Sequence, residues 1–164
     1  MEYKGVDKFN AKPFQWVFGQ AVMIDQENKE TFLIGNTLRD HTIIEYPSRT
    51  TNRFDMHGNE IFGGDIIKKH RSDYVTKKGK LMEDYEFIGV VVYQTIGFEA
   101  LDCVSFEILD DGYPDAFDDV LFYISEMVEV LGNVFEHKSL YNKILNLCPN
   151  KDEYKEYLEN AKFY

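Results

Sequence analysis

RFDMHGNEIFGGDIIKK, residues 53–69, is the stretch of this sequence that decides its fold. Residues 55–59 place a glycine near an aspartate and an asparagine. That composition is typical of a tight turn, because glycine adopts positive φ and short polar side chains accept turn amides. A short apolar run follows, then Gly63 and Gly64 allow a sharp bend before Ile66 and Ile67. The stretch predicts a hairpin turn, a short strand and a second strand that enters the core.

Asp55 and Asp65 are the aspartates of this stretch. A short acidic side chain beside a turn accepts hydrogen bonds from nearby backbone N–H groups. We therefore interpret both residues as turn-stabilising. The alternative is a catalytic carboxylate role.

Three segments of the chain resemble, in order, the YopX protein family of bacteriophages and of prophages in Gram-positive bacteria. The first is GNEIFGGDII at residues 58–67, which resembles the central motif of the family. The second is GVVVY at residues 89–93, followed by Phe98, and the third is VEVLGNVFE at residues 128–136, followed by Leu140. Together they extend over the C-terminal two-thirds of the chain.

The resemblance implies a mainly β fold with an SH3-like barrel portion, and it brings no established catalytic residues. The sequence departs from the family pattern at Gly63, where the family more often has a larger residue before its Gly-Asp pair. It also carries a long insertion between the second and third segments.

Composition limits the functional classes. The 164 residues carry a formal net charge of -11, with 44% hydrophobic and 29% charged residues, as expected of a soluble globular protein. The 13 Phe and 11 Tyr favour strands. A negative charge of this size argues against nonspecific binding to a phosphate backbone, which depends on Lys and Arg.

The cellular compartment expected from the sequence is the cytoplasm of the host cell. The first residues lack the apolar core of a signal peptide, and no run approaches the ~20 apolar residues of a membrane span. Cys103 and Cys148 are the cysteines, and Cys103 lies in an apolar pattern that predicts a buried reduced thiol.

Residues 1–52 predict an N-terminal β region. An apolar strand over residues 14–24 and another over 31–34 flank the polar turn 25–30, which predicts a hairpin. A third strand over 42–46 is expected to end at Pro47, which has no N–H to donate. The polar residues 48–52 then read as a connection.

Residues 53–138 predict the SH3-like barrel core. Its later strands are expected at residues 87–96, 98–108 and 127–135, with a bulge at Asp102 and with Ala100 and Phe106 on one face. The residues expected in the core are Ile66, Val91, Phe106 and Val130.

Two charged segments of this region each allow two interpretations. Residues 70–84, with a lysine cluster at 77–80, read as a solvated loop, and the alternative is a functional arm. Residues 110–119 contain five aspartates around a glycine and a proline and read as an exposed turn. The alternative is a calcium site, although the ligand order does not match an EF-hand loop.

Residues 139–164 predict a C-terminal helical segment. Ser139 is the expected N-cap of a helix over residues 140–147, with Leu147 on its apolar face, and Pro149 ends it. A second amphipathic helix is expected from Asp152, with Tyr154 and Leu158 on its apolar face.

The sequence predicts no catalytic, cofactor-binding or metal-binding residue, and hence no enzyme and no cofactor. The histidines, His41, His57, His70 and His137, are scattered without metal-ligand spacing, and the glycines form no phosphate-binding pattern.

The function expected is that of a noncatalytic phage or prophage accessory protein that binds a host or phage protein. One alternative is an acidic protein that acts on nucleic-acid machinery, as a charge mimic or weak binder. Another is an enzyme with an unrecognised site. A homo-oligomer is expected, held through the aromatic stripe Phe14-Trp16-Phe18 or through Tyr154 and Tyr157.

Overall fold

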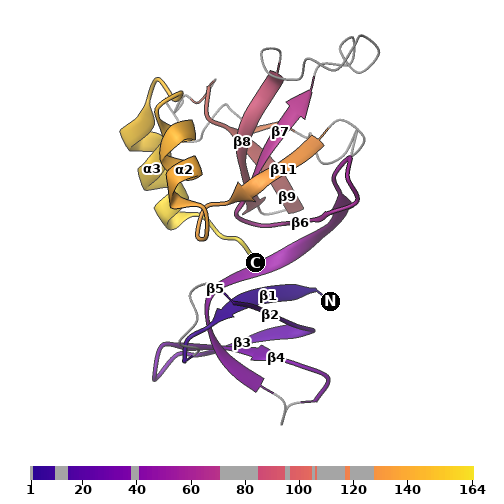
Figure 1. The fold of residues 1–164 in the computed structure, drawn as a ribbon. Helices are drawn as coiled ribbons and strands as arrows, with labels where there is room; N and C mark the ends of the chain where they lie inside the picture. Colours follow the sequence, from indigo (N-terminus) through magenta and orange to yellow (C-terminus); the bar gives the residue numbers. More distant parts are fainter. Residues whose placement is uncertain are drawn as a thin grey trace.

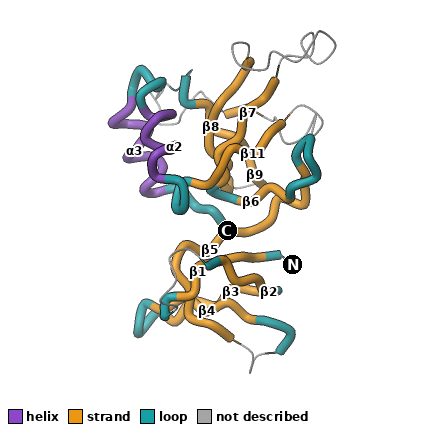
Figure 2. The backbone as a smooth tube through the Cα atoms, in the orientation of Figure 1, coloured by secondary structure: helices purple, strands orange, loops and turns teal. Residues whose placement is uncertain are grey.

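The part of the chain described by the computed structural model forms two antiparallel β-sheets and two short helices (Figures 1 and 2). This confirms the mainly β fold with short C-terminal helices that the sequence predicts. Among the described residues, no helix has the length and apolar character needed to cross a membrane. The described residues are 2–9, 15–37, 41–70, 85–94, 97–104, 106, 117–118 and 128–164.

The first sheet has the strand order β2-β1-β5-β4-β3, with β6 paired to the far end of β5. All of its pairings are antiparallel. Its strands are β1 Tyr3–Asp7, β2 Trp16–Gly19, β3 Ala21–Asp25, β4 Glu30–Ile34, β5 His41–Phe54 and β6 Glu60–Phe62. The hairpin expected around residues 25–30 is confirmed, because β3 and β4 pair on either side of that turn.

The prediction of one strand over residues 14–24 is wrong in its described part, which forms two strands with a bend at Gln20. The Gln20 N–H donates to the carbonyl of Ile34 at 2.8 Å. A Cβ on Gly19 would collide with that same carbonyl. The two strands, β2 and β3, lie at opposite ends of the strand order. The first sheet curls, so that both of them contact β4.

The prediction that a strand ends at Pro47 is also wrong, because β5 continues for 14 residues through the proline. Lys4 pairs with Ser48 whereas Val6 pairs with Glu45, so β5 has one extra residue at this point. Tyr46 has φ of 52° there. Such a bulge leaves a position without a ladder hydrogen bond, where proline is tolerated. Residues 48–52 are consequently strand, and the boundary expected after residue 52 falls inside β5.

The second sheet has the order β10-β9-β8-β7-β11, again antiparallel throughout. In the described part of the chain, the outermost strands β10 and β11 are not paired with each other. Two helices, α2 Lys138–Leu145 and α3 Lys151–Asn160, lie beside this sheet (Figure 1). The strands are β7 Asp65–His70, β8 Tyr85–Gln94, β9 Gly97–Asp102, β10 Phe117–Asp118 and β11 Val128–Asn133.

Apolar side chains cover both faces of the second sheet. On one face, Ile66, Val90 and Leu101 form a cluster with Phe106 and with Ile144 and Tyr154 of the helices. On the other, Ile67, Phe87, Val91, Ala100 and Val128 form a cluster with Ile61 of β6. Burial of Ile66, Val91 and Phe106 is confirmed. Val130 is only partly buried, which corrects the prediction, because it lies on the outermost strand β11.

The expected shared face of Ala100 and Phe106 is wrong, since the two side chains belong to different clusters. The strand alternation stops at Asp102, where the expected bulge is instead the end of β9. The Asp102 carboxylate accepts the N–H of Val104 at 3.1 Å, which turns the chain and brings Phe106 to the helix side.

The first helix begins and ends earlier than predicted. His137, and not Ser139, is its N-cap residue. The His137 N–H donates to the Asn133 carbonyl, and the Asn133 N–H donates to His137 Nδ1 at 3.1 Å, so a closed turn fixes the start at Lys138. Leu147 lies past the helix end and is 45% exposed. The apolar face predicted for α3 is confirmed by the burial of Tyr154 and Leu158.

Candidate functional site

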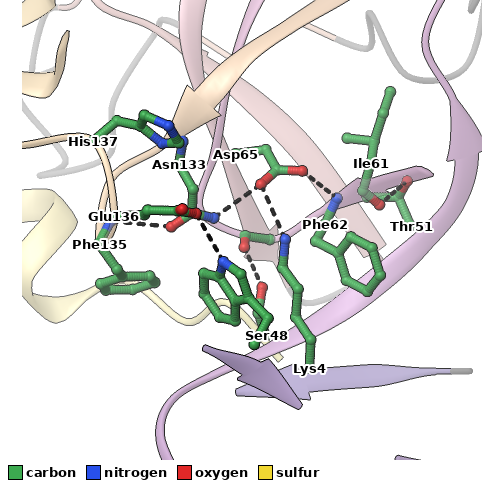
Figure 3. A network of polar contacts seen from close by, with 12 residues as sticks. Lys4, Ser48, Thr51, Ile61, Phe62, Asp65, Asn133, Phe135, Glu136 and His137 are labelled. Carbon is green, nitrogen blue, oxygen red and sulfur yellow. Dashed lines mark hydrogen bonds and ion pairs between the residues drawn. The ribbon is translucent and has the colours of Figure 1, made fainter. Parts of the chain in front are cut away.

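The junction between the two sheets holds the most deeply buried ion pair of the described residues, formed by Lys4 and Asp65 (Figure 3). Lys4 Nζ lies 3.4 Å from Asp65 Oδ1, and the two residues are 8% and 3% exposed. The same Nζ lies 4.6 Å from the ring centroid of Trp16 and 4.1 Å from that of Phe62. The lysine is thus held by an ion pair and by two aromatic rings that attract cations.

Asp65 accepts two further hydrogen bonds. Its Oδ2 accepts the Phe62 N–H and its Oδ1 accepts Asn133 Nδ2, both at 2.8 Å. Burial raises the pKa of Asp65, while Lys4, Asn133 and the Phe62 N–H act in the opposite direction. The carboxylate therefore joins β1, β6, β7 and β11, and we assign it a structural role, consistent with the turn-stabilising interpretation.

Further contacts extend the junction. Trp16 Nε1 donates to Glu136 Oε2 at 2.8 Å, and the Ser48 hydroxyl donates to the Gly63 carbonyl. Residues 162–163 add main-chain bonds to both sheets, because the Phe163 carbonyl accepts the N–H of Arg49 on β5, and the Lys162 carbonyl accepts that of Tyr93 on β8.

Asp55 has the turn-stabilising role that the sequence predicts. Its Oδ1 accepts the N–H groups of His57 at 2.9 Å and Asn59 at 2.8 Å. Its Oδ2 accepts Asn59 Nδ2 at 3.0 Å and the Val130 N–H at 3.1 Å. Burial opposes ionisation of Asp55, but the hydrogen bonds from Asn59, Val130 and His57 outweigh it and lower its pKa. The carboxylate thus ties the turn to β11.

Asp55→Ala is expected to lower the free energy of unfolding by about 1 to 3 kcal/mol at neutral pH, because three partly buried N–H groups and the Asn59 amide lose a charged acceptor. A folded-state pKa below the unfolded value, about 3.9, stabilises the protein above that pH, and the effect is lost as the pH falls through the folded value. The deficit of the variant should therefore shrink towards pH 3 in urea titrations. Asp25→Ala, which removes an exposed turn carboxylate bonded only to its neighbours Glu27 and Asn28, is the control and should cost less.

The histidines and cysteines have structural surroundings where they are described. His57 Nε2 lies 3.7 Å from Glu129 Oε1 at the surface, and His41 packs edge-on against Phe32. Burial raises the pKa of Cys103 to about 12, so the thiol is protonated and is not a nucleophile at neutral pH. Within the ranges that the structure describes, no group of three or more His, Cys, Asp and Glu side chains is placed to hold a metal ion.

The two charged segments singled out in the sequence fall largely outside the described residues. Residues 77–80 lie entirely outside them. Of the acidic segment 110–119, only the backbone of residues 117–118 is described, as β10, which pairs with β9 at Leu101 and Ala100.

Two surface cavities flank the C-terminal residues. One of about 430 Å³ is lined by Tyr93, Gln94, Tyr157, Asn160, Ala161 and Lys162, and Gln94 Nε2 donates to the Tyr157 hydroxyl at 2.8 Å. The other, of about 320 Å³, lies between α2 and α3. Its aromatic lining is Phe135, Tyr141 and Phe163. Lys155 and Glu159 of the second cavity form an ion pair, with Nζ and Oε1 3.7 Å apart. The described lining residues of the two cavities include no Ser, Thr, Cys or His.

The surface feature that stands out is the outer edge of β3. Within the described chain this strand pairs with β4 alone, and its five residues include no lysine, arginine or proline. Met23 is 49% exposed and Ile24 is 50% exposed, although they point to opposite faces of the strand. An edge strand presents unpaired N–H and C=O groups that can bind another extended chain.

The sequence indicates the apolar residues of β3 but not their exposure, because exposure depends on which strand pairs with which. Lys4 carries no local signal at all, since its partner Asp65 is 61 positions away. The aromatic stripe expected at the N-terminus is divided: Trp16 contacts Lys4 and Glu136 in the junction, whereas Phe18 is 46% exposed. Phe14 lies outside the described residues.

No family model matches the chain. No curated protein matches it either. The crystal structure of protein EF1440 from Enterococcus faecalis is similar, with a TM-score of 0.45 and 18% sequence identity over 85% of this chain and 96% of that one.

Proposed function

We propose that this chain is a noncatalytic protein-binding module of phage or prophage origin, acting in the host cytoplasm. The observation that supports binding is the open, apolar edge of β3. The phage origin, and an SH3-like barrel portion within residues 53–138, are supported by the resemblance of residues 58–67, 89–93 and 128–136 to the YopX family.

An extended segment of a partner can add to β3 as a further strand. In such β-augmentation the main-chain hydrogen bonds supply affinity, and alternate side chains of the edge supply specificity. Met23 on one face and Ile24 on the other offer apolar contacts to such a segment. The rest of the first sheet holds the edge in place, because Leu33 and Ile34 of the neighbouring β4 are buried.

Capture of partners on the immobilised chain tests this proposal. We expect host proteins retained by the native chain to be lost with Met23→Lys, which adds a charge at the middle of the edge. Met56→Lys is the matched control, because Met56 is 37% exposed and lies in the turn after β5, away from β3. Identical retained proteins on all three chains would show that the β3 edge does not bind partners.

A second candidate is an acidic protein that acts on nucleic-acid machinery, favoured by the net charge of -11. Such a protein would occupy a basic cleft through its charge. Its partner would be a nucleic-acid enzyme, retained at low salt, released at high salt and unaffected by Met23→Lys. An enzyme with an unrecognised site is the remaining alternative, and no described side-chain arrangement favours it.

Direct binding to duplex DNA is expected to be undetectable in ~0.15 M salt, because Lys and Arg must displace counterions for DNA affinity. The chain has 18 such residues against 29 Asp and Glu. Fluorescence anisotropy with a labelled duplex measures this. Tight binding at that salt concentration would contradict the prediction and give residues 77–80 a functional role.

A further inference from the structure

We propose that β3 of one chain pairs with β3 of a second copy, antiparallel about a two-fold axis at Met23. The first sheets of two chains then form one continuous sheet. This inference rests on the proposed function because it uses the same open edge, for which a second copy and a partner segment would compete. It also gives the expected homo-oligomer a defined interface.

The edge of β3 has few of the features that protect edge strands from pairing. Natural edges carry charged side chains, especially lysine, or proline or a bulge. The segment AVMID has no lysine, proline or bulge, and its one charge, Asp25, lies at the end of the strand. Ala21, Met23 and Ile24 are all exposed. The strand is therefore regular, largely apolar and accessible.

The residues of β3 suit antiparallel pairing with a second copy better than parallel pairing. Antiparallel pairing about Met23 places Met23 opposite its copy, Val22 opposite Ile24, and Ala21 opposite Asp25. Apolar pairs directly opposite each other stabilise a sheet, and like charges opposite each other destabilise it. An in-register parallel pair would set the two Asp25 carboxylates side by side. The antiparallel arrangement avoids that contact, and its two-fold symmetry uses both edges at once, so it closes as a dimer.

Because of the net charge, self-association and the binding of a basic partner segment should depend on salt in opposite ways. Each chain carries -11, so two copies repel at low ionic strength. The Debye length falls from about 10 Å at ~0.1 M salt to about 3 Å at ~1 M, which screens that repulsion. Self-association should therefore strengthen as salt is added, whereas the binding of a basic segment should weaken. The five-residue strand makes a small contact, and we expect a weak dimer.

Sedimentation equilibrium on the purified full chain tests the dimer. The native chain should dimerise with a Kd that falls several-fold when NaCl is raised from ~0.05 M to ~0.5 M. Met23→Lys places two like charges opposite each other and should raise the Kd by at least ~10-fold. Met56→Lys should leave it unchanged. Circular dichroism confirms that both variants are folded, and a native chain that is monomeric at all concentrations overturns the proposal.

Disulfide trapping tests the register. Residues directly opposite in an antiparallel pair have Cα atoms about 4.5 to 5.5 Å apart, within the range of about 4.4 to 6.8 Å that a disulfide spans. Oxidised Met23→Cys should form a covalent dimer, and Met56→Cys should not. Cys103 and Cys148 are buried and contribute no background. Equal cross-linking of the two variants would indicate random collision and overturn the two-fold register.

Failure of this inference differs from failure of the proposed function. A monomeric purified chain whose capture of another protein is abolished by Met23→Lys contradicts the dimer and leaves the binding function standing. If Met23→Lys changes neither self-association nor capture, both are contradicted. A salt-strengthened dimer lost with Met23→Lys supports the inference, whichever further partners are found.

Discussion

Asp65→Ala is expected to lower the free energy of unfolding by about 3 to 5 kcal/mol, because removal of one partner leaves the other as an uncompensated buried charge. Lys4 is 8% exposed and would keep only the faces of Trp16 and Phe62. The substitution also deprives the Phe62 N–H and Asn133 Nδ2 of their acceptor. Chemical denaturation followed by tryptophan fluorescence measures the loss, since Trp16 lies in the junction.

The exposed pair of Lys8 and Glu30 is the control for this result. Its atoms are 3.8 Å apart, but its side chains are 41% and 29% exposed. Glu30→Ala should cost less than about 1 kcal/mol, as surface pairs do. Equal losses for the two substitutions would show that burial of the junction pair does not matter.

Lys4→Met adds a pH signature to the same experiment. Burial raises the pKa of Asp65, and without Lys4 nothing cationic opposes that rise. A folded-state pKa above the unfolded value means that the folded protein binds the proton more tightly, so stability falls as the pH rises through the folded value. The deficit of the variant relative to the native chain should therefore be larger at pH 8 than at pH 5.

Tyr154→Ala is the second large effect, with an expected loss of about 3 to 5 kcal/mol from transfer energy and the cavity left behind. Tyr154 is fully buried, its ring lies 4.9 Å from that of Phe106, and its hydroxyl donates to the Leu101 carbonyl at 2.9 Å. The side chain therefore anchors α3 to β9. Thermal or urea unfolding followed by circular dichroism gives the value.

Two variants separate the parts of the Tyr154 effect. Tyr154→Phe keeps the ring and removes the hydrogen bond to Leu101, so it should cost about 0.5 to 1.5 kcal/mol, the net contribution of one hydrogen bond. Leu147→Ala truncates an apolar side chain that is 45% exposed and should change stability little. A Tyr154→Ala loss no larger than that of Leu147→Ala would mean that α3 is not part of the core.

The local sequence pattern predicts those parts of the fold in which strand pairing and burial follow from the alternation of polar and apolar residues and from turn residues. Alternation and turn chemistry predict the hairpin of β3 and β4, the turn at Asp55 and the apolar face of α3, and the structure confirms all three. The strand end predicted at Pro47 is wrong because proline, which has no N–H to donate, lies at a bulge where the ladder needs no donor. The face predicted for Phe106 is wrong because the alternation of apolar residues continues in the sequence after β9 has ended.

The candidate site is harder to predict, because it depends on relations between distant segments. The residues of β3 read like those of any half-buried strand, and only the strand order places it at an edge. Likewise, an N-terminal lysine such as Lys4 is ordinarily a surface residue, and its burial follows from the meeting of β1, β6 and β7.

The junction also affects how quickly the chain folds. Its contacts join residues 61, 68 and 120 positions apart, in the pairs Lys4 with Asp65, Asp65 with Asn133, and Trp16 with Glu136. Proteins dominated by such distant contacts fold slowly, because the entropy of closing long loops must be lost before the contacts form. The hairpin of β3 and β4 is local and can form early. Its apolar edge stays exposed while the junction forms, and unpaired edges make partly folded chains prone to aggregation.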